Sequence, residues 1–279
     1  MATRYLKFFN AATDIWHHTK EVTVDSLNEV NSGSSSNDPL DVIDLASGPG
    51  EPGCTIAKTW PNSRVTITDG AEAMLDLAKS RISEFGLKDR VRTQKMELHD
   101  FTPVQGLKFD VATAQFALMF TPDFDVCLKE ITSVLRPNGV MVGTVWEQFD
   151  VLTLLRATMT KLLGQAPPPP PINPLSLKDP DFVDQELSSA GFSMLSRHNE
   201  SKRCDFNIGD VTQDDEPYMA CLIPVTPALQ AMKDEGKHDD PIGAALEILK
   251  AEAENGGHIR DNHFHVEGTY RYFAVRYGD

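Results

Sequence analysis

Apolar and polar side chains alternate along this chain with two different periods. In the first thirty residues, Phe8, Ile15 and Trp16 belong to a set of apolar positions at helical spacing, which predicts a helix. Between Asp41 and Trp146, short apolar runs typical of strands alternate with amphipathic runs typical of helices. This alternation predicts a parallel sheet flanked by helices. The expected strands are 42–45, 65–68, 91–95, 111–115 and 140–146, and the expected helices are 52–60, 73–85 and 125–135.

The pattern changes after Trp146. A helix is expected at 152–163, followed by five prolines at 167–171, which favour a stiff connector over a ligand for an SH3 or WW domain. Residues 136–139 (RPNG) predict a turn that leads into the strand at 140–146. A further helix is expected at 179–190, strands at 192–196 and 268–277, and partly helical structure at 202–266. We therefore predict three parts: an N-terminal helical lid (1–40), a core (41–146) and a connector, helical cap and final strands (147–279).

Composition and charge narrow the possible partners. The formal net charge is -15, which argues against nucleic acid as a substrate because phosphate binding needs a surplus of Lys and Arg. No stretch approaches the ~18 consecutive apolar residues of a membrane span. The N-terminus lacks the apolar run of a signal peptide, so we expect a cytoplasmic protein. The four cysteines show no CxxC spacing, which favours reduced, buried thiols over a zinc site or disulfides.

The strongest motif is a strand that runs into a glycine-rich turn and a helix, residues 42–53 (VIDLASGPGEPG). Gly48 and Gly50 let the backbone approach a ligand closely. Together with Gly53 they also satisfy GxGxxG, and Asp69 follows Gly48 by 21 residues, so a dinucleotide site has to be weighed. Asp44, just ahead of the glycines, would repel a pyrophosphate and attract an ammonium group. S-adenosylmethionine carries such a group, and NAD does not.

The stretch DLASGPGEPG resembles the first motif of class I S-adenosylmethionine-dependent methyltransferases, closest to the ubiquinone and menaquinone C-methyltransferases and their small-molecule relatives. The resemblance covers 41–146, with Ala46 where glycine is common. It implies a Rossmann-like α/β fold: a mostly parallel seven-stranded sheet with helices on both faces and a helical cap. It also implies that Asp44 faces the methionine part of the cofactor directly or indirectly. The turn that would touch this part contains Ala46, Ser47, Gly48 and Gly50.

Residues 65–75 (VTITDGAEAML) resemble the second motif of the family. The resemblance implies that Asp69 accepts hydrogen bonds from both ribose hydroxyls and that Met74 packs on the adenine. Gly70 stands where bulkier residues are usual. An alternative role for Asp69 is to cap the helix that begins near Ala71.

Two further stretches complete the resemblance. In QKMELHDF (94–101), Glu97 would bind the adenine amino group and the backbone N–H of Leu98 a ring nitrogen, with Asp100 as the alternative acid. In FDVATAQFALMF (109–120), Gln115 and Phe116 would lie at the carboxyl edge of the sheet beside the methyl donor.

Two absent motifs bear on the reaction. No NPPY-type tetrapeptide follows the fourth strand, and no Tyr has a Lys four residues later. Both absences favour methyl transfer to a small-molecule acceptor, with S-adenosylhomocysteine as the product. Two alternatives stay open: a catalytically inactive binding protein of this fold, and an NAD(P)-dependent oxidoreductase.

No catalytic residue is identified by the sequence. A base is needed only if the acceptor must lose a proton, and an ordinary structural role is favoured for each candidate: His198, Tyr218, His258, His263 and His265. Asp261, His263 and His265 form a D-x-H-x-H pattern, but no further ligand is identifiable, so we expect no metal. The N-terminal segment and residues 150–266 are expected to enclose the acceptor, because the connections within 41–146 are short.

Overall fold

The computed structural model describes residues 13–30, 39–169 and 172–278. The predictions on Phe8 and on Pro170 and Pro171 lie outside these residues, as does the side chain of Trp16. Two compact units divide the chain. We call one the core unit (Asp14–Glu147, Ile172–Lys202 and Tyr270–Asp279) and the other the appended unit (Gln148–Pro171 and Arg203–Thr269), in each case for the described residues.

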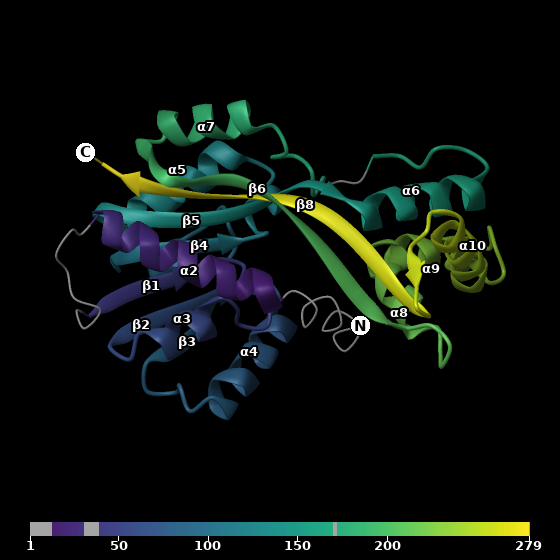
Figure 1. Ribbon diagram of the computed structural model, residues 1–279, viewed down its shortest axis with the longest axis horizontal. Helices are drawn as coiled ribbons and strands as arrows, with labels where there is room; N and C mark the ends of the chain where they lie inside the picture. The colour runs from purple at the N-terminus through teal and green to yellow at the C-terminus, as the bar shows by residue number, and fades with distance from the viewer. Residues whose placement is uncertain (1–12, 31–38, 170–171, 279) are drawn as a thin grey trace. The chain divides into compact units, whose positions relative to one another are not determined.

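A single sheet runs through the described residues. Its strand order is β3 (Val91–Lys95), β2 (Ser63–Asp69), β1 (Leu40–Asp44), β4 (Phe109–Gln115), β5 (Leu135–Phe149), β8 (His263–Tyr277) and β6 (Phe192–Asp210) (Figure 1). The four pairings among β1 to β5 are parallel, as predicted. An eighth strand of the described chain, β7 (Ile259–Arg260), pairs antiparallel with β8, so the sheet has one short strand more than the seven expected.

The helices of the core unit bury apolar residues at helical spacing. They are α2 (Thr13–Val30), α3 (Gly53–Thr59), α4 (Glu72–Glu84), α5 (Phe124–Val134) and α7 (Pro180–Ser189), with short 3-10 turns η1 (Thr102–Val104) and η2 (Leu118–Phe120). In α5, Cys127, Leu128 and Ile131 are fully buried. Ile56 of α3 and Leu75 of α4 pack with Ile67 of β2 in one apolar cluster. This burial fixes α3 and α4 against the strands that carry the glycine-rich turn.

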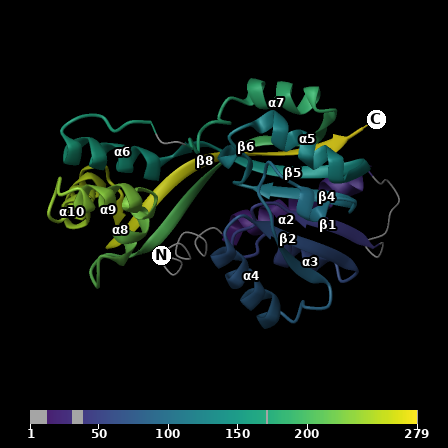
Figure 2. The same cartoon turned by 180° about the vertical axis from the view of Figure 1, so that it is seen from behind.

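The appended unit is mainly helical. It contains α6 (Asp150–Leu163), α8 (Glu216–Cys221), η3 (Ile223–Val225), α9 (Thr226–Asp234) and α10 (Pro241–Asn255), together with β7 and parts of β6 and β8 (Figure 2). An ion pair joins α6 to α10, with Lys161 Nζ 2.5 Å from Glu252 Oε1. In the part of the chain that the structure describes, no helix combines the length and the apolar character needed to cross a membrane.

Two local predictions need correction. The strand expected at 192–196 continues to Asp210, and in this continuation Phe206 and Ile208 alternate with polar residues and are buried. The partly helical structure expected at 202–266 is confirmed by α8, α9 and α10, while 259–260 and 263–266 lie in β7 and β8. The expected turn at 136–139 lies inside β5 as an irregularity: Leu135 pairs with Phe109 and Val140 with Val111.

Candidate functional site

The glycine-rich turn joins β1 to α3 and depends on left-handed backbone conformations. Ala46, Gly48 and Gly50 have φ angles of 47°, 57° and 103°. A Cβ atom on Gly50 would lie 3.3 Å from the Cβ atom of Ala78, and one on Gly53 would lie 2.8 Å from Asp44 Oδ2. Glycine is therefore required at 50 by both conformation and space, whereas Ala46 holds a conformation that glycine adopts more easily.

Asp44 organises this turn from the interior. Its side chain is fully buried, and its carboxylate accepts hydrogen bonds from Thr113 Oγ1 (2.7 Å), Ser47 Oγ (2.5 Å) and Gly53 N (2.8 Å). Burial raises the pKa of Asp44 to about 6, although these three hydrogen bonds act in the opposite direction. The carboxylate therefore joins β1, β4 and the start of α3.

Carboxylates accept hydrogen bonds from three backbone N–H groups in the turn and at the start of α3. Besides Gly53 N, which donates to Asp44, Thr55 N donates to Glu51 Oε2 (2.9 Å) and Gly48 N donates to Asp69 Oδ2 (2.9 Å). Such amides at a helix N-terminus ordinarily attract phosphate groups. Here the protein's own acids satisfy them.

Asp69 ends β2 and reaches across to the turn. Its carboxylate is half-buried and accepts one N–H on each oxygen, from Gly48 (2.9 Å) and from Ala71 (2.8 Å). Burial raises the pKa of Asp69, and the nearby charge of Glu97 adds to the shift. The N-cap of α4 is Ala71, with no side-chain cap, so Asp69 binds the N–H of the N-cap residue and does not cap the helix itself. Its carboxylate keeps lone pairs for another donor.

Glu97 lies against Gly70. A Cβ atom on Gly70 would lie 2.7 Å from Glu97 Oε1, so the small residue leaves room for the longer acid. The carboxylate of Asp100 instead accepts the backbone N–H of Thr102 at 3.0 Å. The structure thus brings Glu97, and not Asp100, towards Asp69. Met74 of α4 and Leu98, which follows Glu97 in the sequence, are half-buried.

Gln115 ends β4 and carries a buried amide. Its side chain is 8% exposed, and neither its Oε1 nor its Nε2 has a hydrogen-bond partner among the described residues. The next residue, Phe116, has a φ of 48°, and its N–H donates to Thr144 Oγ1 at 2.9 Å. Buried polar groups without partners are rare in proteins and point to a functional site.

Aromatic rings gather beside Gln115. The ring of Phe116 stacks on Trp146, with centroids 4.1 Å apart and an interplanar angle of 11°, and meets Tyr270 edge-on at 5.7 Å. Tyr270 and Trp146 are nearly buried. These contacts hold Phe116 in its strained conformation at the carboxyl edge of the sheet.

The side chains of the candidate bases named from the sequence lie outside the described part of the core unit. Tyr218, His258, His263 and His265 belong to the appended unit, and the side chain of His198 lies outside the described residues. Burial raises the pKa of Tyr218, whose ring packs on Phe264 with centroids 5.0 Å apart.

The D-x-H-x-H pattern is not gathered into one cluster. The Nδ1 atom of His265 lies 2.9 Å from Asp205 Oδ1, while that of His263 lies 3.0 Å from the backbone oxygen of Asp261. Within the described ranges, no three His, Cys, Asp or Glu side chains are placed to hold a metal ion.

Several residues of the site were not expected from the sequence. Thr113 binds Asp44 and is its register partner on β4, while Glu51 forms an ion pair with Arg81 (3.1 Å) and Thr144 holds the backbone of Phe116. Strand pairing of β1 with β4 would have indicated Thr113. The other two contacts join residues that lie about 30 positions apart in the sequence and belong to no common motif.

Comparison with known proteins places this arrangement in a family. Residues 42–139 match the methyltransferase domain. The chain is 30% identical over 113 residues to trans-aconitate 2-methyltransferase of Enterobacter sp. (strain 638), covering 40% of this chain and 42% of that protein. It is 33% identical over 101 residues to demethylmenaquinone methyltransferase of Staphylococcus aureus, covering 36% and 40%. These matches therefore span less than half of either relative.

The fold also resembles solved structures that have low sequence identity to this chain. The crystal structure of the YcgJ protein of Bacillus subtilis matches with a TM-score of 0.57 at 12% identity, covering 94% of this chain and 99% of that one. Strand order, parallel pairing and the glycine-rich turn agree with the sequence match. Residues 42–139 are thus a methyltransferase domain of the class I, Rossmann-like family.

Proposed function

We propose that this chain transfers a methyl group from S-adenosylmethionine to a small-molecule acceptor and releases S-adenosylhomocysteine. The observation that carries the proposal is the use of carboxylates at the glycine-rich turn. Asp44, Glu51 and Asp69 accept the N–H groups of Gly53, Thr55 and Gly48. A pyrophosphate would find these donors occupied and would be repelled by the acids. A cofactor with a positively charged ammonium group and sulfonium group would be attracted by the negative charge of these carboxylates.

Asp69 and Glu97 suit the nucleoside part of this cofactor. The lone pairs that remain on the Asp69 carboxylate can accept hydrogen bonds from ribose hydroxyls. Glu97, held against Gly70, is an exposed acceptor for the adenine amino group. Met74 and Leu98 supply half-buried apolar neighbours for the base. We assign Asp44 an indirect role, since it is fully buried and its carboxylate already accepts three hydrogen bonds.

Gln115 and Phe116 suit the reacting end. The buried amide of Gln115 has no partner within the described chain, so both its donor and its acceptor remain available for a ligand. The neighbouring stack of Phe116 on Trp146 offers apolar surface that excludes water. Ala46, Ser47, Gly48 and Gly50 shape the turn that would carry the methionine part.

The cofactor supplies an electrophilic methyl group on sulfur. The protein has to align the acceptor with that methyl group and keep water away. In this proposal, the amide of Gln115 orients the bound ligand and the ring of Phe116 keeps water from the reacting end. The carboxylate of Asp69 anchors the ribose of the cofactor. A base is required only for an acceptor that loses a proton, and no side chain at the carboxyl edge is assigned that role.

The acceptor is proposed to be a small molecule. The net charge of -15 disfavours nucleic acid. Trans-aconitate 2-methyltransferase and demethylmenaquinone methyltransferase are both named for small-molecule acceptors.

Calorimetry with S-adenosylhomocysteine and with NAD tests the cofactor. We expect saturable binding of the first and none of the second. Binding of NAD without binding of S-adenosylhomocysteine would overturn the proposal and favour the oxidoreductase. Incubation with S-adenosylmethionine and pooled metabolites, followed by mass analysis, then tests turnover. Cofactor binding without any methylated product from these pools would favour the inactive binding protein.

A further inference from the structure

A pocket opens at the opposite ends of the same strands. It has a volume of about 560 Å³ and is lined by residues at the starts of β1 to β5 and in the loops before them. Asp41 lies in its wall, three residues before Asp44 on β1. At about 3.3 Å per residue, the pocket is separated from the glycine-rich turn by roughly 10 Å of strand. It is therefore distinct from the proposed cofactor site.

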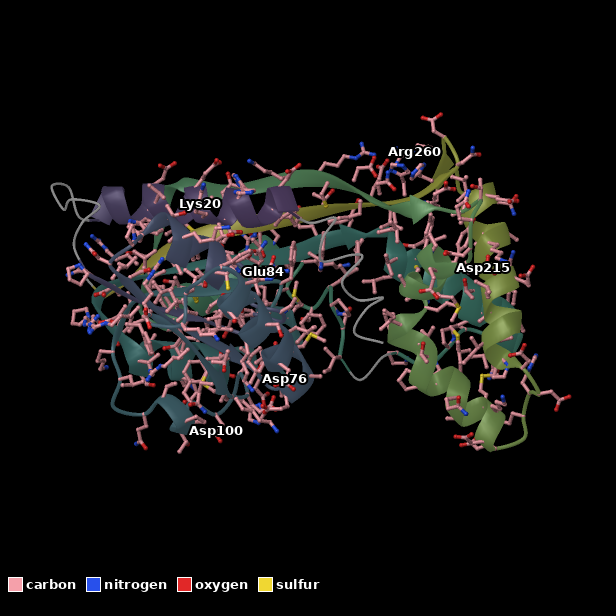
Figure 3. All side chains as sticks on the ribbon, turned by 90° about the horizontal axis from the view of Figure 1, so that it is seen from below. Lys20, Asp76, Glu84, Asp100, Asp215 and Arg260 are labelled. Carbon is pink, nitrogen blue, oxygen red and sulfur yellow. The ribbon has the colours of Figure 1, made fainter. Side chains whose placement is uncertain are left out.

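The lining of this pocket is positively charged. It includes two carboxylates, Asp41 and Asp89, against six cations, which gives a local charge of +4 in a chain whose net charge is -15. Acidic residues mark the core unit elsewhere, such as Asp76, Glu84 and Asp100 in Figure 3. The six cations are Arg64, Lys88, Arg90, Arg92, Lys108 and Arg136.

Two of the six are neutralised within the protein. Arg64 Nε lies 2.7 Å from Asp41 Oδ1, and Arg136 Nη2 lies 2.9 Å from Asp41 Oδ2. Arg136 also pairs with Asp110 at 2.8 Å. These contacts fix one wall of the pocket.

The other four cations have no carboxylate partner among the described residues. Arg92 Nε donates to Thr66 Oγ1 (3.0 Å), Lys108 Nζ to the backbone oxygen of Ser133 (2.7 Å) and Arg90 Nη1 to that of Trp60 (3.2 Å). Neutral acceptors hold these side chains in place without cancelling their charge. Lys88 is exposed beside them. The charge is thus positioned in advance for an anion.

We propose that this pocket binds a small diphosphate-bearing molecule as a second ligand of the protein. Several fixed cations favour a multivalent anion over a single carboxylate, and guanidinium groups match the geometry of phosphate oxygens. The volume lies in the range of small-molecule sites and exceeds what one phosphate ion fills. A nucleic acid is disfavoured because the net charge of the whole chain is -15.

Inorganic pyrophosphate is the probe for this site. Titration of the full chain at low ionic strength should show one saturable site, weakened by added KCl. Inorganic phosphate should bind more weakly because it offers fewer oxygens to the same cations. Absence of saturable binding, or equal affinity for both anions, would overturn the proposal.

Two double variants locate the binding. Lys88→Gln with Arg92→Gln should weaken pyrophosphate by about tenfold or more through lost charge-assisted hydrogen bonds. Lys79→Gln with Lys129→Gln removes the same charge from exposed helix positions outside the pocket and should change affinity less than about twofold. Equal weakening in both would mean non-specific attraction and would sink the assignment. Thermal melting checks folding, and Lys88→Gln alone, at an exposed position, serves if the double variant is unstable.

Discussion

The two ends of the parallel strands differ in how they treat charge. At the carboxyl ends, the carboxylates of Asp44 and Asp69 accept hydrogen bonds from backbone N–H groups of the glycine-rich segment, and Glu97 lies close to Asp69. At the amino ends, arginines surround Asp41 and leave a cationic pocket. Helix N-termini commonly make the carboxyl end of such a sheet attractive to anions. In this protein, acidic side chains make the carboxyl ends of the strands unfavourable for anions, and cationic side chains make the amino ends favourable for them.

Asp41 and Asp44 both lie on β1, and their pKa values are shifted in opposite directions. Burial raises the pKa of Asp44 to about 6. Burial also acts to raise the pKa of Asp41, but hydrogen bonds from Arg64 and Arg136 outweigh it, and the net shift is downward. Acidification should therefore stabilise the fold through Asp44 and destabilise it through Asp41.

The largest expected effect is the pH dependence that Asp44 confers. Its folded pKa of about 6 lies above the ordinary value of 3.8, so its contribution to stability is fully present below pH 3.8 and is lost as pH rises through 6. At 1.36 kcal/mol per pKa unit, wild type should gain up to about 3 kcal/mol relative to Asp44→Asn between pH 7 and pH 4. Urea unfolding across this range measures the difference.

Asp100→Asn is the control for that experiment. Asp100 is exposed, and hydrogen bonds from Thr102 lower its pKa, so this substitution should not remove the gain on acidification. Parallel stability profiles for wild type and Asp44→Asn would contradict the role of Asp44 burial.

Asp69 tests the ligand preference of the carboxyl edge. Asp69→Ala should weaken S-adenosylhomocysteine by about 1.5 to 3 kcal/mol, since charge-assisted hydrogen bonds to the ribose would be lost. Asp100→Ala is the matched control, because its carboxylate engages Thr102. Calorimetry measures both, and circular dichroism checks that the turn variant folds. Unchanged affinity in Asp69→Ala would leave Asp69 with only its bonds to Gly48 and Ala71.

The sequence predicted the elements that are encoded by hydrophobic periodicity or by motifs of adjacent residues. The strand at 91–95 was predicted with its observed limits, and the Asp44 to Gly53 turn was identified from adjacent residues. The extent of β6 was missed because the short alternation around Phe206 was outweighed by acidic and helix-forming residues that follow. The cationic pocket was missed for another reason: Arg64, Lys108 and Arg136 lie far apart in sequence and meet only through strand pairing. The isolation of the Gln115 amide likewise depends on tertiary packing.

Gln115 tests whether the carboxyl edge is built for a ligand at the expense of stability. Gln115→Leu should raise the free energy of unfolding by about 1 kcal/mol, because it replaces a buried amide without partners by an apolar group of similar size. The same change should weaken S-adenosylhomocysteine. Gln105→Leu, at an exposed position, should leave both quantities unchanged. A loss of stability in Gln115→Leu would mean that the amide is satisfied in solution.

The smallest effects are expected from the ion pairs at the amino end. Arg136 joins Asp41 of β1 to Asp110 of β4, whereas Arg64 reaches only Asp41 and is the more exposed cation, with 70% of its side chain accessible against 40%. Exposed pairs contribute about 0.2 to 1 kcal/mol, so Arg136→Gln should cost below about 1 kcal/mol at pH 7 and Arg64→Gln less. Both losses should shrink in 1 M KCl, and both should shrink as pH falls through the lowered pKa of Asp41, since a protonated carboxyl no longer pairs. Equal costs for the two arginines would show that the bridge to Asp110 adds nothing. A cost for Arg136→Gln that persists in salt and acid would mean that the guanidinium packs between the strands more than it neutralises Asp41.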